Sequence, residues 1–158
     1  MDREVTANGW IIREPIDLKK QTPTIAQVEN PTLSQIRTSI ATIDGHLAYM
    51  LVLENRKSYI RVRGTQQGRY LVDLVPDEQT HQNKVYHLVD STLLKSTELF
   101  YLKFENGEAN DLPVYYAVTQ DIAAQAVVEF ILTGKLDESL TWQIGANKFI
   151  GPGISEEL

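Results

Sequence analysis

The stretch from residue 114 to residue 142 constrains the fold of this chain more than any other part of the sequence. Its apolar residues recur at spacings of one, three and four, which places them on one face of a helix. Thr119 can cap that helix, because its hydroxyl can accept a hydrogen bond from an amide of the first turn. Gly134 can adopt the left-handed conformation that ends a helix. The pattern predicts a helix over residues 120–133.

A second helix is predicted earlier in the chain, over residues 31–43. Asn30 is a suitable cap, and Pro31 at the first helical position loses only an amide that would have no helical partner. Gly45 is positioned to end the helix. Four apolar residues share one face, at spacings of three, four and three: Leu33, Ile36, Ile40 and Ile43.

Between and around these helices the apolar pattern has a period of two, which is typical of strands. Strands are expected near residues 47–53, 59–63, 70–75, 85–89, 100–104 and 114–118, followed by a final strand that ends at Trp142. Before them, residues 10–13 could hold a short strand, and residues 25–28 are a short apolar piece with no assigned structure. The nearly continuous apolar run at 47–53 predicts a central strand covered on both faces. Asn106-Gly107 predicts a hairpin, with 114–118 as the returning strand.

The sum of these patterns is an α+β fold in a single domain over residues 1–158. A meandering antiparallel sheet is expected to pack against the two main helices. Residues 1–29 and 144–158 are expected to be peripheral segments. The chain has no cysteine, so disulfides and thiolate metal sites are excluded. We expect a cytoplasmic protein with no membrane partner, because no secretory signal or membrane-spanning run is present.

The distribution of charge along the chain is more informative about a partner than the net charge of −6. The first 60 residues carry seven acidic and seven basic groups, whereas residues 105–158 carry nine acidic groups and only Lys135 and Lys148 as basic ones. The excess negative charge therefore lies in the last third, which has a net charge of −7. Such a field disfavours nucleic acid as a partner and favours a basic one.

No catalytic, cofactor or metal site can be assembled from the sequence, and we expect no enzymatic activity. His46, His81 and His87 form no pair with ligand spacing, and no nucleophile has a base beside it. The glycines of the segment 64–68 lack the lysine and the following helix that a phosphate loop needs. Arg61 and its neighbouring arginines are expected to form cross-strand pairs with Asp73 on a solvated sheet face.

Glu105, Glu108 and Asp111 cluster around the predicted Asn-Gly turn. On such a turn all three carboxylates should be exposed, which argues against shifted pKa values and acid–base chemistry. Two interpretations remain: an ordinary solvated turn, or an acidic patch that attracts a basic partner.

The order of elements, and two motifs, resemble the first-numbered family of immunity proteins from bacterial polymorphic-toxin systems, often encoded beside deaminase-type toxins. One motif is the strand pair that runs through Tyr59-Ile60-Arg61-Val62-Arg63-Gly64 and Gly68-Arg69-Tyr70-Leu71-Val72-Asp73. The other runs from Ala126 through Phe130 to Thr133-Gly134 and ends at Trp142. The resemblance covers roughly residues 30–142. It departs where Asp73 replaces a usual glutamate and where residues 135–137 lack a proline.

The resemblance implies a non-enzymatic inhibitor that binds the C-terminal domain of a cognate toxin, and that toxin is expected to act on nucleic acid. The residues expected to contact that partner are Glu105, Glu108, Asp111, Tyr115 and Trp142, with Tyr116 as a further aromatic candidate. For each of these aromatic residues, a position in the core is favoured over one at an interface. The alternative function is a small-ligand-binding or regulatory module, which a deep cavity with convergent polar groups would favour.

Overall fold

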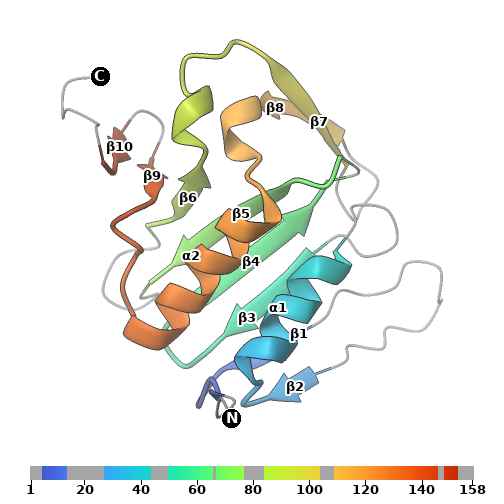
Figure 1. The fold of residues 1–158 in the computed structure, drawn as a ribbon, viewed down its shortest axis with the longest axis vertical. Coiled ribbons are helices and arrows are strands. Elements are labelled where there is room, and N and C mark those ends of the chain that lie inside the picture. Colours follow the sequence, from blue (N-terminus) through green and yellow to red (C-terminus); the bar gives the residue numbers. More distant parts are fainter. Residues whose placement is uncertain are drawn as a thin grey trace.

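The computed structural model describes residues 5–13, 27–43, 50–65, 67–76, 84–103, 109–145 and 148–152. Within them, two helices pack against one face of an eight-stranded antiparallel sheet, as expected for a single α+β domain (Figure 1). The helices are α1 (Leu33–Thr42) and α2 (Gln120–Thr133). The strand order is β10-β9-β6-β5-β4-β3-β1-β2. No helix among the described residues is long and apolar enough to cross a membrane.

The strands of this sheet are β1 (Ile11–Arg13), β2 (Gln27–Glu29), β3 (Met50–Glu54), β4 (Tyr59–Gly64), β5 (Tyr70–Val75), β6 (Tyr86–Val89), β9 (Thr141–Ile144) and β10 (Lys148–Ile150). Two further strands, β7 (Leu99–Lys103) and β8 (Ala109–Pro113), form a separate antiparallel hairpin. Short 3-10 helices lie at Ser91–Leu93 (η1) and Val114–Tyr116 (η2).

The local signals predicted for α2 are confirmed. The Thr119 hydroxyl accepts a hydrogen bond from the amide of Ile122 at 3.4 Å. Gly134 follows the last turn with a φ of 71°, and its amide donates to the carbonyl of Phe130. A residue with a Cβ would be strained at that φ, so glycine ends the helix at low cost.

The predicted cap of α1 is wrong. Thr32, rather than Asn30, caps the helix: its hydroxyl accepts from the Gln35 amide, and the Gln35 side chain accepts from the Thr32 amide. This reciprocal pair satisfies two amides at once, which a cap at Asn30 could not do. The Asn30 side chain instead accepts a hydrogen bond from the amide of Gly9. Gly45, expected to end the helix, lies outside the described residues.

The main core lies between the helices and the sheet. α2 contributes Ala123, Ala126, Val127, Val128 and Phe130, and α1 contributes Leu33, Ile36 and Ile40. Trp10 meets Phe130 edge to face, with ring centroids 6.0 Å apart. Trp142 on β9 is only 1% exposed, and its indole N–H donates to the carbonyl of Asp137. The Thr133-Gly134 turn and Trp142, which carry the resemblance, therefore serve the fold.

The ends of the chain are less peripheral than the sequence predicted. Trp10 and Ile12 are buried, and β1 and β2 complete one edge of the sheet. β10 pairs with β9 at the other edge. These short segments carry weak periodicity, and they are ordered by pairing with strands that are distant in sequence.

The strand covered on both faces is β5 rather than β3. β3 alternates between buried and half-buried residues, whereas the first five residues of β5 are all buried. β5 lies under the helices on one face. On the other face Leu71 packs against Phe100, Leu102 and Ala117, from the hairpin and the segment after it. The apolar run at residues 47–53 alone did not indicate which strand would be covered on both faces.

The strand that returns from the hairpin turn is β8, and the prediction of a strand at 114–118 is wrong. β8 pairs with β7 as far as Pro113, which lies opposite Leu99. Proline has no amide to extend the ladder, and residues 114–116 then form the 3-10 turn η2. Only Val118 rejoins the sheet, through an isolated bridge to Tyr70.

Candidate functional site

The face of the sheet opposite the helices carries a row of polar side chains across four neighbouring strands. The register aligns Arg61 on β4 with Asp73 on β5, Asp73 with His87 on β6, and His87 with Gln143 on β9. Successive side chains of a strand point to opposite faces, so the apolar neighbours of these residues enter the helix-side core. The alternation predicted from the sequence for β4 is confirmed, and it leaves Arg61 on this second face.

Asp73 is the centre of the row. Its Oδ2 accepts hydrogen bonds from Arg61 Nε at 3.1 Å and from Arg61 Nη2 at 2.6 Å. Its Oδ1 lies 2.6 Å from His87 Nδ1. The Asp73 side chain is 10% exposed, whereas those of Arg61 and His87 are 30% and 34% exposed. The predicted cross-strand pairing of Arg61 with Asp73 is confirmed, but the predicted solvated face is wrong, because Asp73 is buried. His87 joins the pair from a third strand.

This arrangement keeps Asp73 ionised. Burial alone would raise the pKa of the carboxyl, but the hydrogen bond with His87 and the charge of Arg61 together lower that pKa below its ordinary value of 3.8. Because an ionised carboxylate can only accept, His87 Nδ1 carries the proton of this hydrogen bond. In the neutral ring Nε2 is then the acceptor.

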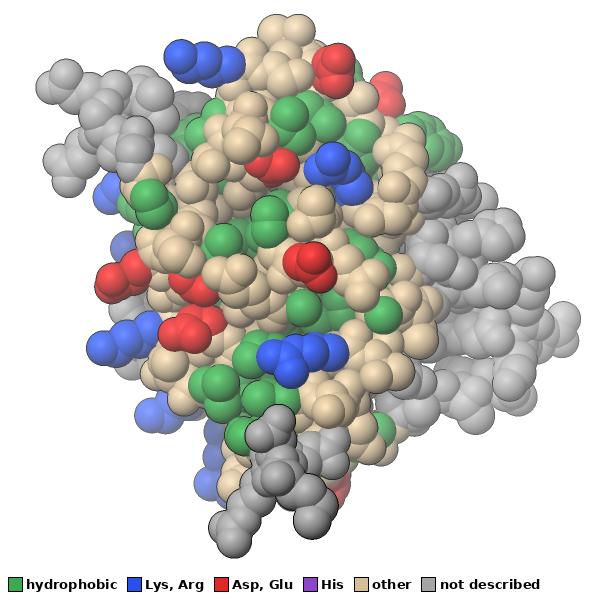
Figure 2. All heavy atoms as spheres, viewed as in Figure 1, with side chains coloured by type: hydrophobic (Ala, Val, Ile, Leu, Met, Phe, Trp, Pro, Cys, Tyr) green, Lys and Arg blue, Asp and Glu red, His purple; other side chains and the backbone are tan. Residues whose placement is uncertain are grey.

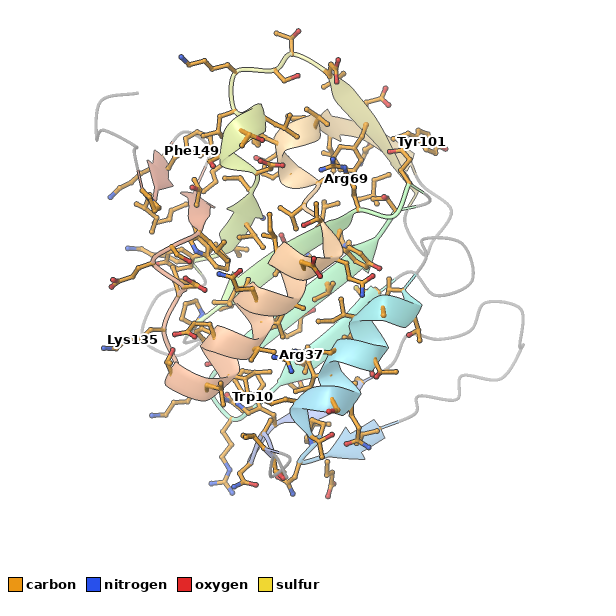
Figure 3. The ribbon with its side chains drawn as sticks, viewed as in Figure 1. Trp10, Arg37, Arg69, Tyr101, Lys135 and Phe149 are labelled. Carbon is orange, nitrogen blue, oxygen red and sulfur yellow. The ribbon has the colours of Figure 1, made fainter. Side chains whose placement is uncertain are left out.

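Aromatic rings flank the polar row where η2 crosses it. Tyr116 meets the ring of His87 edge to face at 5.8 Å, and Tyr115 lies 4.6 Å from Tyr116 between ring centroids. Phe149 on β10 meets Tyr115 at 5.9 Å, and Figure 3 shows it at the edge of the sheet farthest from α1. Burial, followed by the hydrogen bond and charge interaction with Tyr115, raises the pKa of Tyr116 to about 12.

We expect Tyr116 to ionise later than an ordinary tyrosine when the protein is titrated with alkali. The tyrosinate absorbance of the wild type, minus that of Tyr116→Phe, should rise with a midpoint near pH 12 rather than pH 10. The folded pKa is raised, so this group's contribution to stability is intact below about pH 10 and is lost as the pH rises through 12. A difference curve centred at pH 10 would show that Tyr116 is solvated.

A pocket of about 260 Å³ opens over this row. Its polar lining comes from Arg61, Arg63, Asp73 and His87, and its apolar lining comes from Leu71, Val72, Leu88, Leu112 and Tyr116. β4, β5 and β6 supply the floor. β8 and η2 supply one wall, because the inner face of the hairpin packs on β5. The pocket combines convergent polar groups with an apolar wall, as ligand sites do.

The outer face of the hairpin is the second candidate surface. Leu99 is 61% exposed and Tyr101 is 57% exposed, and Asp111 lies directly opposite Tyr101 in the ladder. Figure 3 shows Tyr101 at the edge of the molecule, on the strand that Figure 1 labels β7. Phe100 and Leu102, the alternate residues of β7, are buried on the inner face. The hairpin is therefore amphipathic, with an outer face that exposes large apolar groups.

The structure separates the residues that the sequence proposed for partner binding. Asp111 is exposed on β8, Tyr115 is half-buried in η2, and Trp142 is a core residue that no partner can contact on the folded surface. Glu105 and Glu108 lie outside the described residues, in the segment that connects β7 to β8. Of the five, Asp111 is the one that the structure places beside an exposed aromatic ring.

Sequence reasoning missed the role of His87 and the outer face of β7. The sequence shows no metal-ligand spacing around His87 and indicates no other partner for it. Its partner Asp73 lies 14 positions away and becomes its neighbour only through strand pairing. The alternation of Leu99 and Tyr101 with Phe100 and Leu102 was the signal that could have revealed an exposed apolar face.

On the helix side, hydrophobic side chains show between the helices, and charged side chains stand singly or in small mixed groups (Figure 2). The described residues form no single continuous acidic patch in that view. Comparison with known proteins adds no assignment: the chain matches no family model, no curated protein and no solved structure.

Proposed function

We propose that this chain is a non-enzymatic immunity protein that binds a cognate bacterial toxin domain and neutralises it. The resemblance over residues 30–142 suggests this function, and the observation that carries the proposal is the amphipathic β7–β8 hairpin. An exposed apolar patch that is rimmed by polar side chains often marks a protein–protein interaction site. The outer face of this hairpin has that composition.

The hairpin has both apolar side chains that can anchor a partner and carboxylates that can attract a basic one. Tyr101 and Leu99 can supply desolvated anchors, and tyrosine is among the residues that dominate interface energies. Asp111 stands opposite Tyr101, and the chain between the strands contains Glu105 and Glu108. A toxin domain that acts on nucleic acid would be basic, so these carboxylates would speed its approach and orient it.

The test is binding to the C-terminal domain of the toxin encoded beside this chain, measured by calorimetry and by rescue of growth. We expect a dissociation constant of micromolar or below. Tyr101→Ala should weaken binding by roughly 30-fold, since a central aromatic anchor contributes about 2 kcal/mol or more. Leu132→Ala is the matched control, because Leu132 is also exposed, at 53%, but lies in α2, near its C-terminal end.

Charge reversal at Asp111, Glu105 or Glu108 should lower the association rate and reduce its dependence on salt. If Tyr101→Ala and the three reversals all bind like the wild type, the hairpin is not the docking surface. If the toxin domain neither binds nor is neutralised, the immunity function itself is wrong.

A further inference from the structure

We propose that the pocket on the second face of the sheet binds a small organic carboxylate that has an apolar body and an O–H or N–H donor. This site is distinct from the outer face of the hairpin, which the proposed immunity function uses. The inner face of the same hairpin forms a wall of the pocket. The inference therefore does not depend on a toxin partner.

The first argument concerns Arg61. A guanidinium group has donors on three nitrogens, and Asp73 accepts from two of them, Nε and Nη2. Within the described part of the chain, Nη1 of Arg61 has no hydrogen-bond partner. The pairing with Asp73 holds the guanidinium plane in place, so the remaining donor is already oriented before a ligand arrives. A carboxylate is the group that matches such a donor most strongly.

The second argument concerns the sign of charge and the role of His87. Two guanidinium groups, those of Arg61 and Arg63, and one carboxylate, that of Asp73, are among the residues that line the pocket. Asp73 accepts the hydrogen bond from His87 Nδ1, so Nε2 is the ring nitrogen left for a ligand, and it is an acceptor whenever the ring is neutral. A hydroxyl or amine on the ligand would supply the hydrogen that Nε2 can accept.

The third argument concerns shape. The pocket has an apolar side, formed by Leu71, Leu112 and Tyr116. A fully polar anion would bury no apolar surface against it. Its volume of about 260 Å³ is just below the range of about 300–1,000 Å³ that is usual for drug-sized ligands. Together these features select a compact molecule with a carboxylate at one end and a ring or short hydrocarbon at the other.

The experiment uses three matched probes, with binding followed by amide chemical shifts of the full chain. Mandelate has the carboxylate, the hydroxyl and an apolar ring; mandelamide lacks the charge; phenylacetate lacks the hydroxyl. Mandelate should shift the amides of Leu71, Asp73, His87 and Leu112 at concentrations on the order of 1–10 mM, as expected for so small a ligand. Mandelamide should bind roughly tenfold more weakly and phenylacetate about fivefold more weakly.

Variants of the protein locate the site. Arg61→Gln should weaken mandelate binding by roughly tenfold, because it removes the charged donor. Arg13→Gln is the matched control: Arg13 lies on the same face of the sheet and pairs with Glu54 at 2.7 Å, but it does not line the pocket. Leu112→Ala tests the apolar wall without disturbing the ion pair, and it should weaken all three probes.

Equal binding of mandelate and mandelamide would overturn the proposal, as would shifts that map away from the pocket. An absence of shifts up to roughly 10 mM mandelate would do the same, since the weakest specific site of this kind should saturate partly there. Equal effects of Arg61→Gln and Arg13→Gln would show that Arg61 does not hold the anion.

Discussion

Replacing Trp142 with alanine is expected to lower the free energy of unfolding by about 3–5 kcal/mol. Trp142 is 1% exposed in the core beneath α2, and its indole N–H donates to the Asp137 carbonyl at 3.2 Å. The substitution removes a large buried ring and leaves a cavity that the sheet can only partly close. Chemical denaturation measures the loss, which is a large part of the 5–15 kcal/mol typical of a domain.

Tyr101→Ala is the contrasting variant. Tyr101 is 57% exposed, so its loss should change stability by less than about 1 kcal/mol while it weakens binding of the toxin domain. Trp142→Ala should show the opposite behaviour, with binding lost only in proportion to the unfolded fraction. If folded Trp142→Ala protein has specifically lost the partner, Trp142 takes part in recognition and its position in the core is wrong.

Asp73→Ala is expected to destabilise the protein by about 3 kcal/mol at neutral pH. Removing one partner of a buried ion pair typically costs about 3–5 kcal/mol. We expect the lower end of this range of costs because the Arg61 side chain is 30% exposed and water can partly hydrate its charge once Asp73 is removed. His87 also loses the acceptor of its Nδ1 hydrogen bond. The matched control is Glu54→Ala, which breaks the more exposed pair with Arg13 (side chains 30% and 48% exposed) and should cost less than about 1 kcal/mol.

The cost of Asp73→Ala should depend on pH in a defined direction. The folded pKa of Asp73 is lowered below 3.8, so its ionised form contributes stability above the unfolded pKa, and that contribution is lost as the pH falls through the folded value. The difference in unfolding free energy between wild type and Asp73→Ala should therefore narrow on acidification below about pH 4. A difference that stays constant down to pH 2 would show that the charge of Asp73 contributes nothing.

These variants distinguish two surfaces that share one hairpin. The inner residues Phe100 and Leu102 attach the hairpin to β5 and help to form the pocket wall, while Leu99 and Tyr101 remain outside. A molecule in the pocket would touch Leu112 on β8, directly opposite Phe100 in the ladder. The proposed ligand site and the proposed docking surface would therefore share a single two-stranded element.

The sequence determined the elements whose signals are local. The helix α2 was predictable in full because Thr119, the apolar face and Gly134 act within one turn of their neighbours. Alternation along β4 likewise predicted that Ile60 and Val62 enter the core and that Arg61 lies on the other face. Each of these inferences needs only the geometry of a single helix or strand.

Only the tertiary structure decided what these elements form together. The cluster of Arg61, Asp73 and His87 depends on the register of three strands, and a shift of one residue in either pairing would disperse it. Trp142 was a candidate for both core and surface until the pairing of β9 with β6 brought its ring into the core cluster that also contains the buried face of α2. Likewise, β5 became the doubly covered strand because the hairpin packs on its second face. Local periodicity gives the faces of an element, but contacts distant in sequence decide what covers each face.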